Sequence, residues 1–599
     1  MAAPETVSMR TRDGVRLDAD VYSPQASGRY PVLLMRQPYG RRIASTVTYA
    51  HPAWYAAQGY IVVIQDVRGR GSSEGGFDPL AHERDDGRDT LDWAAGLPGC
   101  DGSIGMYGFS YQGATQLLAA ASGHPALKTI CPAMCAWDLY ADWAHEGGAP
   151  RLALNLGWAA QIAAETARRG ADHERYAALY AAGHAPGDDL LIDACGPRVR
   201  ELLAGSHYAD WLDQPRGSDY WKRRSPGTGF IAPSAPGAPL AAPDASGPAT
   251  TAPSLPALHI GGWFDFFLTG TLAAFEHFRA GPALQRLVIG PWFHLPWSRS
   301  LGGVRLPESA QPRIDALQLR WFDHHLKGVD NGVDREAAVQ LYDLGSGAWH
   351  QLKSYPQVQD LRLQLASDGR ASLDVEAGRL EAAGPTSAPG GAGPTSAPGG
   401  AGATSAPGGA GATSAPGSAG ASPITTTALP IDIIVHDPWR SVPTVGGHLP
   451  PSMGMQERGE VDERGDVATY TTAPLARALQ LIGPVSCVLQ ADADTPGFDI
   501  AAVLGVIDAQ GRVRNLTQGY LRCAAAGAQQ VPLRHVCARI APGERLRLSI
   551  SAASYPGYAM HPGRAIAPGA ARAADHSIIT VRLDPAGSSL SLPRFMPDA

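Results

Sequence analysis

Three polar residues, each expected directly after a strand, could together perform nucleophilic chemistry. Ser110 lies in Gly108-Phe-Ser-Tyr-Gln-Gly113, which follows an apolar strand and precedes a helix of small residues. Flanking glycines allow a serine to occupy a sharp, strained strand-to-helix turn with its hydroxyl exposed. The usual pattern places the second glycine one residue earlier, so the motif alone also fits an ordinary glycine-bounded turn. Ser110 is the leading candidate nucleophile.

A serine nucleophile needs a base, and the base needs an acid that orients it. Asp265 ends the segment His259-Ile-Gly-Gly-Trp-Phe-Asp265, and His294 ends Val288-Ile-Gly-Pro-Trp-Phe-His294. Each segment begins as an apolar strand, so both side chains are expected at the C-terminal edge of one parallel sheet, where open α/β folds gather their sites. The chain order Ser, Asp, His is that of an α/β-hydrolase. We therefore predict a catalytic triad of Ser110, Asp265 and His294.

Strands that alternate with helices must position these residues. The expected strands cover 15–22, 30–35, 60–65, 103–107, 257–260 and 286–289, and the expected helices cover 52–58, 83–95 and 314–327. Apolar strands alternating with helices indicate a largely parallel sheet that is covered on both faces. The sequence thus predicts the α/β class, with an α/β-hydrolase domain formed by residues 1–140 and 251–335.

Two further regions have a different texture. Residues 141–250 are rich in alanine, with helices expected at 152–169 and 173–182, which predicts a helical cap inserted into the α/β domain. Residues 336–599 predict a C-terminal β-sandwich, a jelly roll, because strands and turns dominate there. Its expected strands cover 338–342, 361–365, 480–489, 500–507, 545–550 and 576–583.

Residues 384–421 repeat a nine-residue unit of Gly, Ala, Pro, Ser and Thr. The unit has no large apolar side chain whose burial could offset the entropy of ordering the chain. We predict a disordered, solvent-exposed loop whose removal leaves activity intact.

Composition and short motifs argue against several classes of function. The 49 basic residues are scattered and outnumbered by 56 acidic ones, which is not the pattern of a nucleic-acid partner. No segment approaches the roughly 18 apolar residues of a membrane span, and the N-terminus lacks the pattern of a secretory signal. We therefore expect no membrane partner and a cytoplasmic location.

The cysteines and the glycine-rich loop do not indicate a cofactor. The seven cysteines include no C-x-x-C pair and are expected to be reduced, without a metal. The glycine-rich loop at 69–75 lacks both the P-loop lysine and the dinucleotide spacing, so we reject nucleotide binding. We expect neither a metal nor an organic cofactor.

Six short motifs carry a family resemblance. They are Arg12-Asp-Gly-Val-Arg-Leu17, Arg36-Gln-Pro-Tyr39, Asp66-Val-Arg-Gly-Arg-Gly71, Gly108-Phe-Ser-Tyr-Gln-Gly113, Gly262-Trp-Phe-Asp265 and Gly290-Pro-Trp-Phe-His294. Together they resemble the cocaine esterase / X-Pro dipeptidyl-peptidase (CocE/NonD, peptidase S15-like) family of serine hydrolases. That family has the elbow G-x-S-Y-x-G, which accounts for the displaced glycine, and the resemblance extends over essentially the whole chain.

The resemblance implies a role for five residues. Ser110 would be the nucleophile, His294 the general base and then acid, and Asp265 the residue that fixes the imidazole tautomer. The oxyanion hole would be formed by the hydroxyl of Tyr39 and the backbone N–H of Tyr111. Preorganised donors of this kind are worth about 3 kcal/mol each.

The residues after Asp265 bear on the substrate. The branch of the family that hydrolyses α-amino acid esters has carboxylates shortly after the catalytic Asp, which hold the substrate ammonium. Here Phe266 and Phe267 follow instead. This departure predicts an apolar wall and an uncharged acyl group, with Trp137 and Trp143 adding aromatic surface.

We therefore predict a serine hydrolase of the carboxylesterase type that cleaves a small-molecule ester, or an amide, through an acyl-enzyme intermediate. Two alternatives remain open at this point. An amidase, acylase or acyltransferase could use the same triad, and an inactive binding protein could act through the jelly roll. The sequence also leaves open the oligomeric state, including a homodimer.

Overall fold

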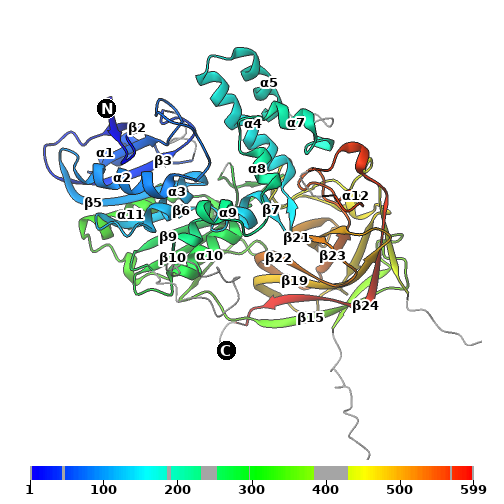
Figure 1. Ribbon diagram of the computed structural model, residues 1–599. Coiled ribbons are helices and arrows are strands. Elements are labelled where there is room, and N and C mark those ends of the chain that lie inside the picture. Colours follow the sequence, from blue (N-terminus) through cyan, green and yellow to red (C-terminus); the bar gives the residue numbers. More distant parts are fainter. Residues whose placement is uncertain are drawn as a thin grey trace, which may run out of the picture.

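The computed structural model describes residues 3–42, 48–184, 191–230, 253–295, 297–382, 430–566 and 570–596. Figure 1 shows an α/β unit drawn in blue to green, cap helices that project from it, and a β-rich unit that ends in red. The arrangement confirms the predicted fold class, an α/β-hydrolase domain with a helical cap and a C-terminal β-sandwich. The predicted loop 384–421 lies outside the described residues.

The α/β unit is built on a ten-stranded sheet of order β1-β2-β4-β3-β5-β6-β9-β10-β13-β14. The strands are β1 (Glu5–Arg10), β2 (Arg16–Tyr22), β3 (Tyr30–Gln37), β4 (Ile61–Asp66), β5 (Cys100–Phe109), β6 (Leu127–Ala133), β9 (Ala257–Phe264), β10 (Gln285–Phe293), β13 (Val339–Tyr342) and β14 (Trp349–Leu352). All pairings from β4 to β13 are parallel, whereas β1, β2 and β14 pair antiparallel at the edges. The C-terminal ends of the central strands therefore meet at one edge of the sheet.

Helices cover both faces of this sheet. They are α1 (Pro52–Ala57), α2 (Glu83–Ala95), α3 (Tyr111–Ala120), α10 (Leu268–Phe278) and α11 (Ile314–Lys327). Neighbouring residues of β3 point to opposite faces, so Val32 packs in the core that contains α2 and α3, and Leu33 packs in the core that contains α1 and α11. Burial on both faces explains why the strands are continuous apolar runs.

The cap lies between β6 and β9. Its helices are α4 (Leu152–Arg169), α5 (His173–His184), α7 (Pro197–Leu202), α8 (Tyr208–Asp213) and α9 (Asp219–Arg224). A short hairpin, β7 (His145–Glu146) and β8 (Ala149–Pro150), precedes α4. Gly147 in its turn has φ +54°, and a Cβ there would lie 2.0 Å from the carbonyl oxygen of Tyr520. The hairpin is therefore packed tightly against the β-rich unit.

The C-terminal unit is a sheet of order β21-β20-β23-β18-β16-β15-β24-β19-β22, with β17 paired to β24. Its strands are β15 (Gln359–Ala366), β16 (Gly378–Ala382), β17 (Asp432–His436), β18 (Val467–Thr471), β19 (Leu479–Ala493), β20 (Phe498–Ile507), β21 (Val513–Cys523), β22 (Gly527–Ile540), β23 (Arg545–Ser551) and β24 (Ile579–Arg594). It shares one apolar core with the end of the first sheet, in which Trp263 and Tyr342 join Val536. The two units are thus packed together rather than tethered.

The structure differs from the predicted start of the β-sandwich at residue 336. The strand expected there, observed as Val339–Tyr342, pairs in parallel with Leu287–Ile289 of β10, and β14 then pairs with it antiparallel. The first sheet therefore continues to Leu352. The strand pattern was correct, but its partner is set by long-range packing, which an apolar run does not encode. Within the described residues, no helix is both long and apolar enough to cross a lipid bilayer.

Candidate active site

Ser110 occupies a strained turn between β5 and α3. It has φ +60°, a region that non-glycine residues rarely adopt, and it is only 6% exposed. Its backbone N–H lies 3.0 Å from the carbonyl oxygens of both Ala133 and Met134 at the end of β6. A strained backbone conformation of this kind persists only where the surrounding structure fixes it, and such residues cluster at functional sites.

Packing explains the displaced glycine of the elbow. A Cβ at Gly113 would lie 2.8 Å from the carbonyl oxygen of Ala133 and 2.8 Å from the Cβ of Cys135. A Cβ at Gly108, where φ is +136°, would lie 2.5 Å from the Cβ of Gln112. Both glycines are therefore required where α3 approaches the strands, and position 112 is free to carry a side chain.

Asp265 and His294 are adjacent because their strands are in register. Phe264, the last residue of β9, stands opposite Phe293, the last residue of β10, so the next residue of each strand projects from the same place. The Nδ1 atom of His294 lies 2.8 Å from Oδ1 of Asp265, which is fully buried. With Nδ1–H donating to the carboxylate, Nε2 is left to accept a proton.

Aromatic rings surround the imidazole of His294. The ring centroid of Phe266 lies 4.2 Å away, and those of Phe267 and Phe109 lie 5.4 Å away. Phe109 immediately precedes Ser110, so this contact places His294 beside the elbow. The structure thus gathers the three residues of the predicted triad at one sheet edge.

Tyr39 is the predicted oxyanion residue whose side chain faces the nucleophile. The side chains of Ser110 and Trp158 lie beside its phenol and influence its pKa. Burial raises the pKa of Tyr39 to about 12, so the phenol keeps its proton at neutral pH and can donate to an oxyanion.

Tyr111 offers only its backbone to the site. It is the first residue of α3, directly after Ser110. Its hydroxyl donates to Oε1 of Glu83 at 2.8 Å and accepts from the N–H of Leu80 at 3.0 Å, which turns the side chain into the core. The backbone N–H at the helix start is the donor that the predicted oxyanion hole needs.

An aromatic wall leads away from the triad. Trp143 packs on Phe267 with centroids 4.9 Å apart and on Trp158 with centroids 4.5 Å apart. Trp158 was not among the predicted site residues. It lies on the buried face of α4, and its position on an alanine-rich amphipathic helix gives no indication that it lies beside Tyr39.

Trp137 makes its ring contacts with other residues than Trp143 does, and its predicted place on the substrate surface stays a prediction. It stacks on Phe230 with centroids 5.5 Å apart and lies 5.0 Å from the ring of His277 on α10. These contacts therefore link the cap to α10.

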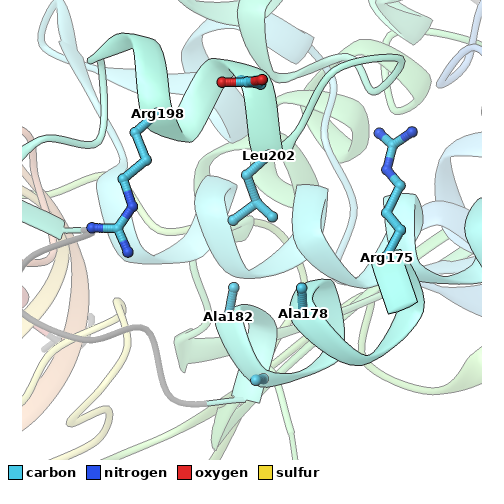
Figure 2. A pocket seen from close by; sticks show the side chains of 7 residues that line it. Arg175, Ala178, Ala182, Arg198 and Leu202 are labelled. Carbon is cyan, nitrogen blue, oxygen red and sulfur yellow. The ribbon is translucent and has the colours of Figure 1, made fainter. Parts of the chain in front are cut away.

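Two of the larger pockets lie against the cap. One, of about 540 Å³, opens beside Pro38 and Tyr39 and is lined on its far side by α4 and α5. Another, of about 660 Å³, lies on the cap surface between α5 and α7, where Figure 2 shows Arg175 and Arg198 on opposite sides of Leu202. The pocket beside Tyr39 reaches a residue of the predicted oxyanion hole, and the cap-surface pocket contains no predicted site residue.

One group of potential metal ligands does not fit a metal. Asp343, His350 and Cys537 bring ligand atoms within 4.8 Å of one another. The Asp343 carboxylate already accepts hydrogen bonds from the side chain of Gln480 and the backbone N–H of Arg539. Burial also raises the pKa of Cys537, which opposes the thiolate that a metal would bind.

Comparisons with known proteins agree with this architecture. Residues 13–296 match the family model of the X-Pro dipeptidyl-peptidase (S15 family), and residues 331–581 match that of the X-Pro dipeptidyl-peptidase C-terminal non-catalytic domain. The chain is 29% identical over 586 residues to the cocaine esterase of Rhodococcus sp. (strain MB1 Bresler), covering 92% of this chain and 91% of that protein.

Two solved structures share the fold over nearly the full length. An aminopeptidase from a marine sediment Thaumarchaeota archaeon has a TM-score of 0.72 at 19% identity, covering 99% of this chain and 97% of that one. An α-amino acid ester hydrolase has a TM-score of 0.68 at 19% identity, covering 99% and 96%. At 19% identity, these two structures support the assignment of the fold only.

Proposed function

Because the chain belongs to the cocaine esterase / X-Pro dipeptidyl-peptidase family of serine hydrolases, we propose that it cleaves carboxylic esters with an uncharged acyl group through an acyl-enzyme on Ser110. The observation that carries the proposal is the Asp265–His294 hydrogen bond of 2.8 Å, near a strained serine that lies beside Tyr39. These are the nucleophile, base, orienting acid and oxyanion donor of acyl transfer.

In the acylation step, Oγ of Ser110 attacks the ester carbonyl while Nε2 of His294 takes its proton. The carbonyl oxygen becomes an oxyanion that accepts hydrogen bonds from the Tyr39 hydroxyl and the Tyr111 N–H. The tetrahedral intermediate then breaks its bond to the alcohol oxygen, which receives the proton from His294. Asp265 stabilises the imidazolium that exists between these two transfers.

Deacylation repeats the same transfers with water. His294 takes a proton from water, whose oxygen attacks the acyl carbonyl, and it returns the proton to Ser110 as the acid is released. The aromatic rings around His294 limit the access of bulk water, so a water molecule must enter after the alcohol has left.

The aromatic wall supports the acyl specificity. Phe266, Phe267, Trp143 and Trp158 form a buried aromatic cluster next to His294, which makes this side of the site apolar. No carboxylate stands at positions 266–268, where a free ammonium group would need one. Burying an unpaired ammonium against such rings is costly, so acyl groups without a charged amine are preferred.

Hydrolysis of a p-nitrophenyl ester series of increasing acyl length, beside the matching anilides, tests the proposal. Ester turnover should exceed anilide turnover, and Ser110→Ala should abolish both it and labelling by a fluorophosphonate. Ser122→Ala, a serine at the other end of α3, is the matched control and should keep full activity. Anilide preference would assign an amidase, and new esters or amides formed with added alcohols or amines would assign an acyltransferase. Absence of Ser110 labelling would favour an inactive binding protein.

A further inference from the structure

The loop that contains Asp265 and Phe266, called the acid loop below, is contacted by a residue of the C-terminal sandwich. Arg534, on β22, donates from Nη1 to the backbone carbonyl of Asp265 and from Nη2 to that of Phe266, both at 3.0 Å. Its side chain is 6% exposed. The planar guanidinium group therefore donates hydrogen bonds to two successive backbone carbonyls. Arginine suits this role because its N–H donors are held in a fixed planar arrangement.

A buried carboxylate keeps this arginine in place. Oε2 of Glu146, in the cap hairpin, lies 3.4 Å from Nη2 of Arg534 and 3.0 Å from Nη2 of Arg151. Arg151 also donates to the carbonyl of Phe266 at 3.3 Å. Although burial opposes the charge on Glu146, His448 and the two arginines hold the pKa of its carboxyl well below the usual value. The cap, the acid loop and the sandwich therefore meet at one cluster of charged side chains.

The carboxylate of Asp265 has few restraints of its own. Oδ1 meets His294, but Oδ2 is buried and has no hydrogen-bond partner among the described residues. Its orientation therefore depends on where the backbone is placed. Within the loop, the Asp265 N–H lies 3.1 Å from the carbonyl oxygen of Gly262, and the Leu268 N–H lies 3.1 Å from that of Asp265. From outside the α/β unit, the backbone of this loop is contacted by Arg534 and by Arg151 of the cap, and of these two only Arg534 donates to the carbonyl of Asp265.

We propose that Arg534 is a positioning residue of the triad, which fixes the Asp265 backbone so that its carboxylate meets Nδ1 of His294. The inference rests on the proposed function. Arg534 contacts backbone carbonyls and not the triad side chains, so its contribution should appear in the chemical steps and not in substrate binding. The C-terminal unit would then supply a functional group to a site built on the first sheet.

The test compares Arg534→Ala and Arg534→Lys with the wild type on p-nitrophenyl esters. Small displacements of catalytic groups can cost about 100-fold in rate, so we expect Arg534→Ala to lower kcat by about 10- to 100-fold with little change in KM. Arg534→Lys can reach only one of the two carbonyls and should be intermediate. Millimolar guanidinium should restore part of the Arg534→Ala rate, whereas sodium chloride of equal ionic strength should not.

Arg547→Ala is the matched control for the loss of a buried arginine. Arg547 lies on β23 of the same sandwich, is 4% exposed and pairs with Glu376. Its removal should lower thermal stability but leave kcat unchanged. Equal losses of kcat in the Arg547 and Arg534 variants, a change confined to KM, or no response to guanidinium would each overturn the proposal.

A second readout separates this inference from the proposed function. The rate at which a fluorophosphonate labels Ser110 depends on the His294–Asp265 pair but not on the natural substrate. If the wild type is labelled but hydrolyses no ester, the ester proposal fails while Arg534→Lys and Arg534→Ala must still slow labelling. Labelling at the wild-type rate in both variants would refute the role of Arg534. Should Arg534→Ala not fold, the Arg534→Lys variant decides alone.

Discussion

The two ends of the candidate triad are held in place by different means. Ser110 is fixed by its own neighbourhood, since the glycines at 108 and 113 and the end of β6 are all within a short stretch of chain. Asp265 is fixed in part by Arg534, which follows it by 269 residues. The serine is thus positioned by residues close to it in the chain. The position of the Asp265 carboxylate depends also on contacts with a distant part of the chain.

The largest expected loss of kcat comes from a substitution of Asp265. Asp265→Asn should lower kcat by about 10⁴-fold, because an amide stabilises the wrong imidazole tautomer. Steady-state kinetics on a p-nitrophenyl ester measure it. Asp432→Asn, another buried aspartate that lies on β17, serves as control and should reduce stability without a comparable loss of kcat. Comparable losses in both variants would remove the basis for an orienting acid.

A double-mutant cycle tests whether Arg534 acts through Asp265. If Arg534 acts through Asp265, adding Arg534→Ala to Asp265→Asn should cost far less than the 10- to 100-fold expected alone. Fully additive losses in kcat would show that Arg534 acts on another part of the site.

At the nucleophile end, Tyr39→Phe removes one oxyanion donor. Loss of such a donor usually lowers kcat by about 100- to 1,000-fold with little change in KM. Because the ring remains, the aromatic surroundings are kept, and Tyr22→Phe, at a partly buried tyrosine on β2, is the control for loss of a phenol hydroxyl. An unchanged kcat in Tyr39→Phe would assign the oxyanion hole to other donors.

The local scaffold can be broken without touching the chemistry. Gly113→Ala places a Cβ 2.8 Å from a backbone oxygen and should destabilise the protein by up to about 3 kcal/mol, measured by urea unfolding. Gly76→Ala meets nothing within 4 Å and should be nearly neutral. An equally neutral Gly113→Ala would mean that α3 can move away from β6.

The smallest expected effect is a pH dependence at the contact between cap and sandwich. Burial lowers the pKa of His448 to about 4, while the unfolded imidazole titrates near 6.5. The unfolded chain therefore binds the extra proton, and stability falls as the pH drops from 6.5 towards 4, by about 2 kcal/mol from this residue at pH 5. Glu146 at 2.8 Å, together with Arg534 and Arg151, faces the ring. His448→Gln should flatten the slope by about one proton, and an unchanged slope would contradict this.

Features that are determined by neighbouring residues could be predicted from the sequence, whereas features that depend on contacts between distant segments could not. The helices expected at 83–95, 152–169 and 314–327 have those limits in the structure, because amphipathic periodicity and caps are local signals. The Ser110 elbow and the strand ends before Asp265 and His294 were predictable for the same reason. Their catalytic roles, and that of Tyr39, stay predictions until the variants are measured.

What the sequence did not reveal depends on contacts between distant segments. Trp158 is one of many apolar residues on α4, and only packing shows that it reaches Tyr39. Trp137 and Trp143 look alike in sequence but pack on different neighbours. Arg534 lies in a strand without any catalytic motif, so no pattern could have connected it to the acid loop.

The distance between Asp265 and Arg534 along the chain also orders events during synthesis. The first sheet is complete when Leu352 has emerged from the ribosome, and domains generally fold in that N-terminal-first order. At about 5–20 residues per second, Arg534 follows roughly 10–40 s later. A nascent chain with a folded first sheet therefore still lacks the arginine that contacts the loop of Asp265. If Arg534 positions the triad as proposed, full hydrolytic activity is expected only when the polypeptide is nearly finished.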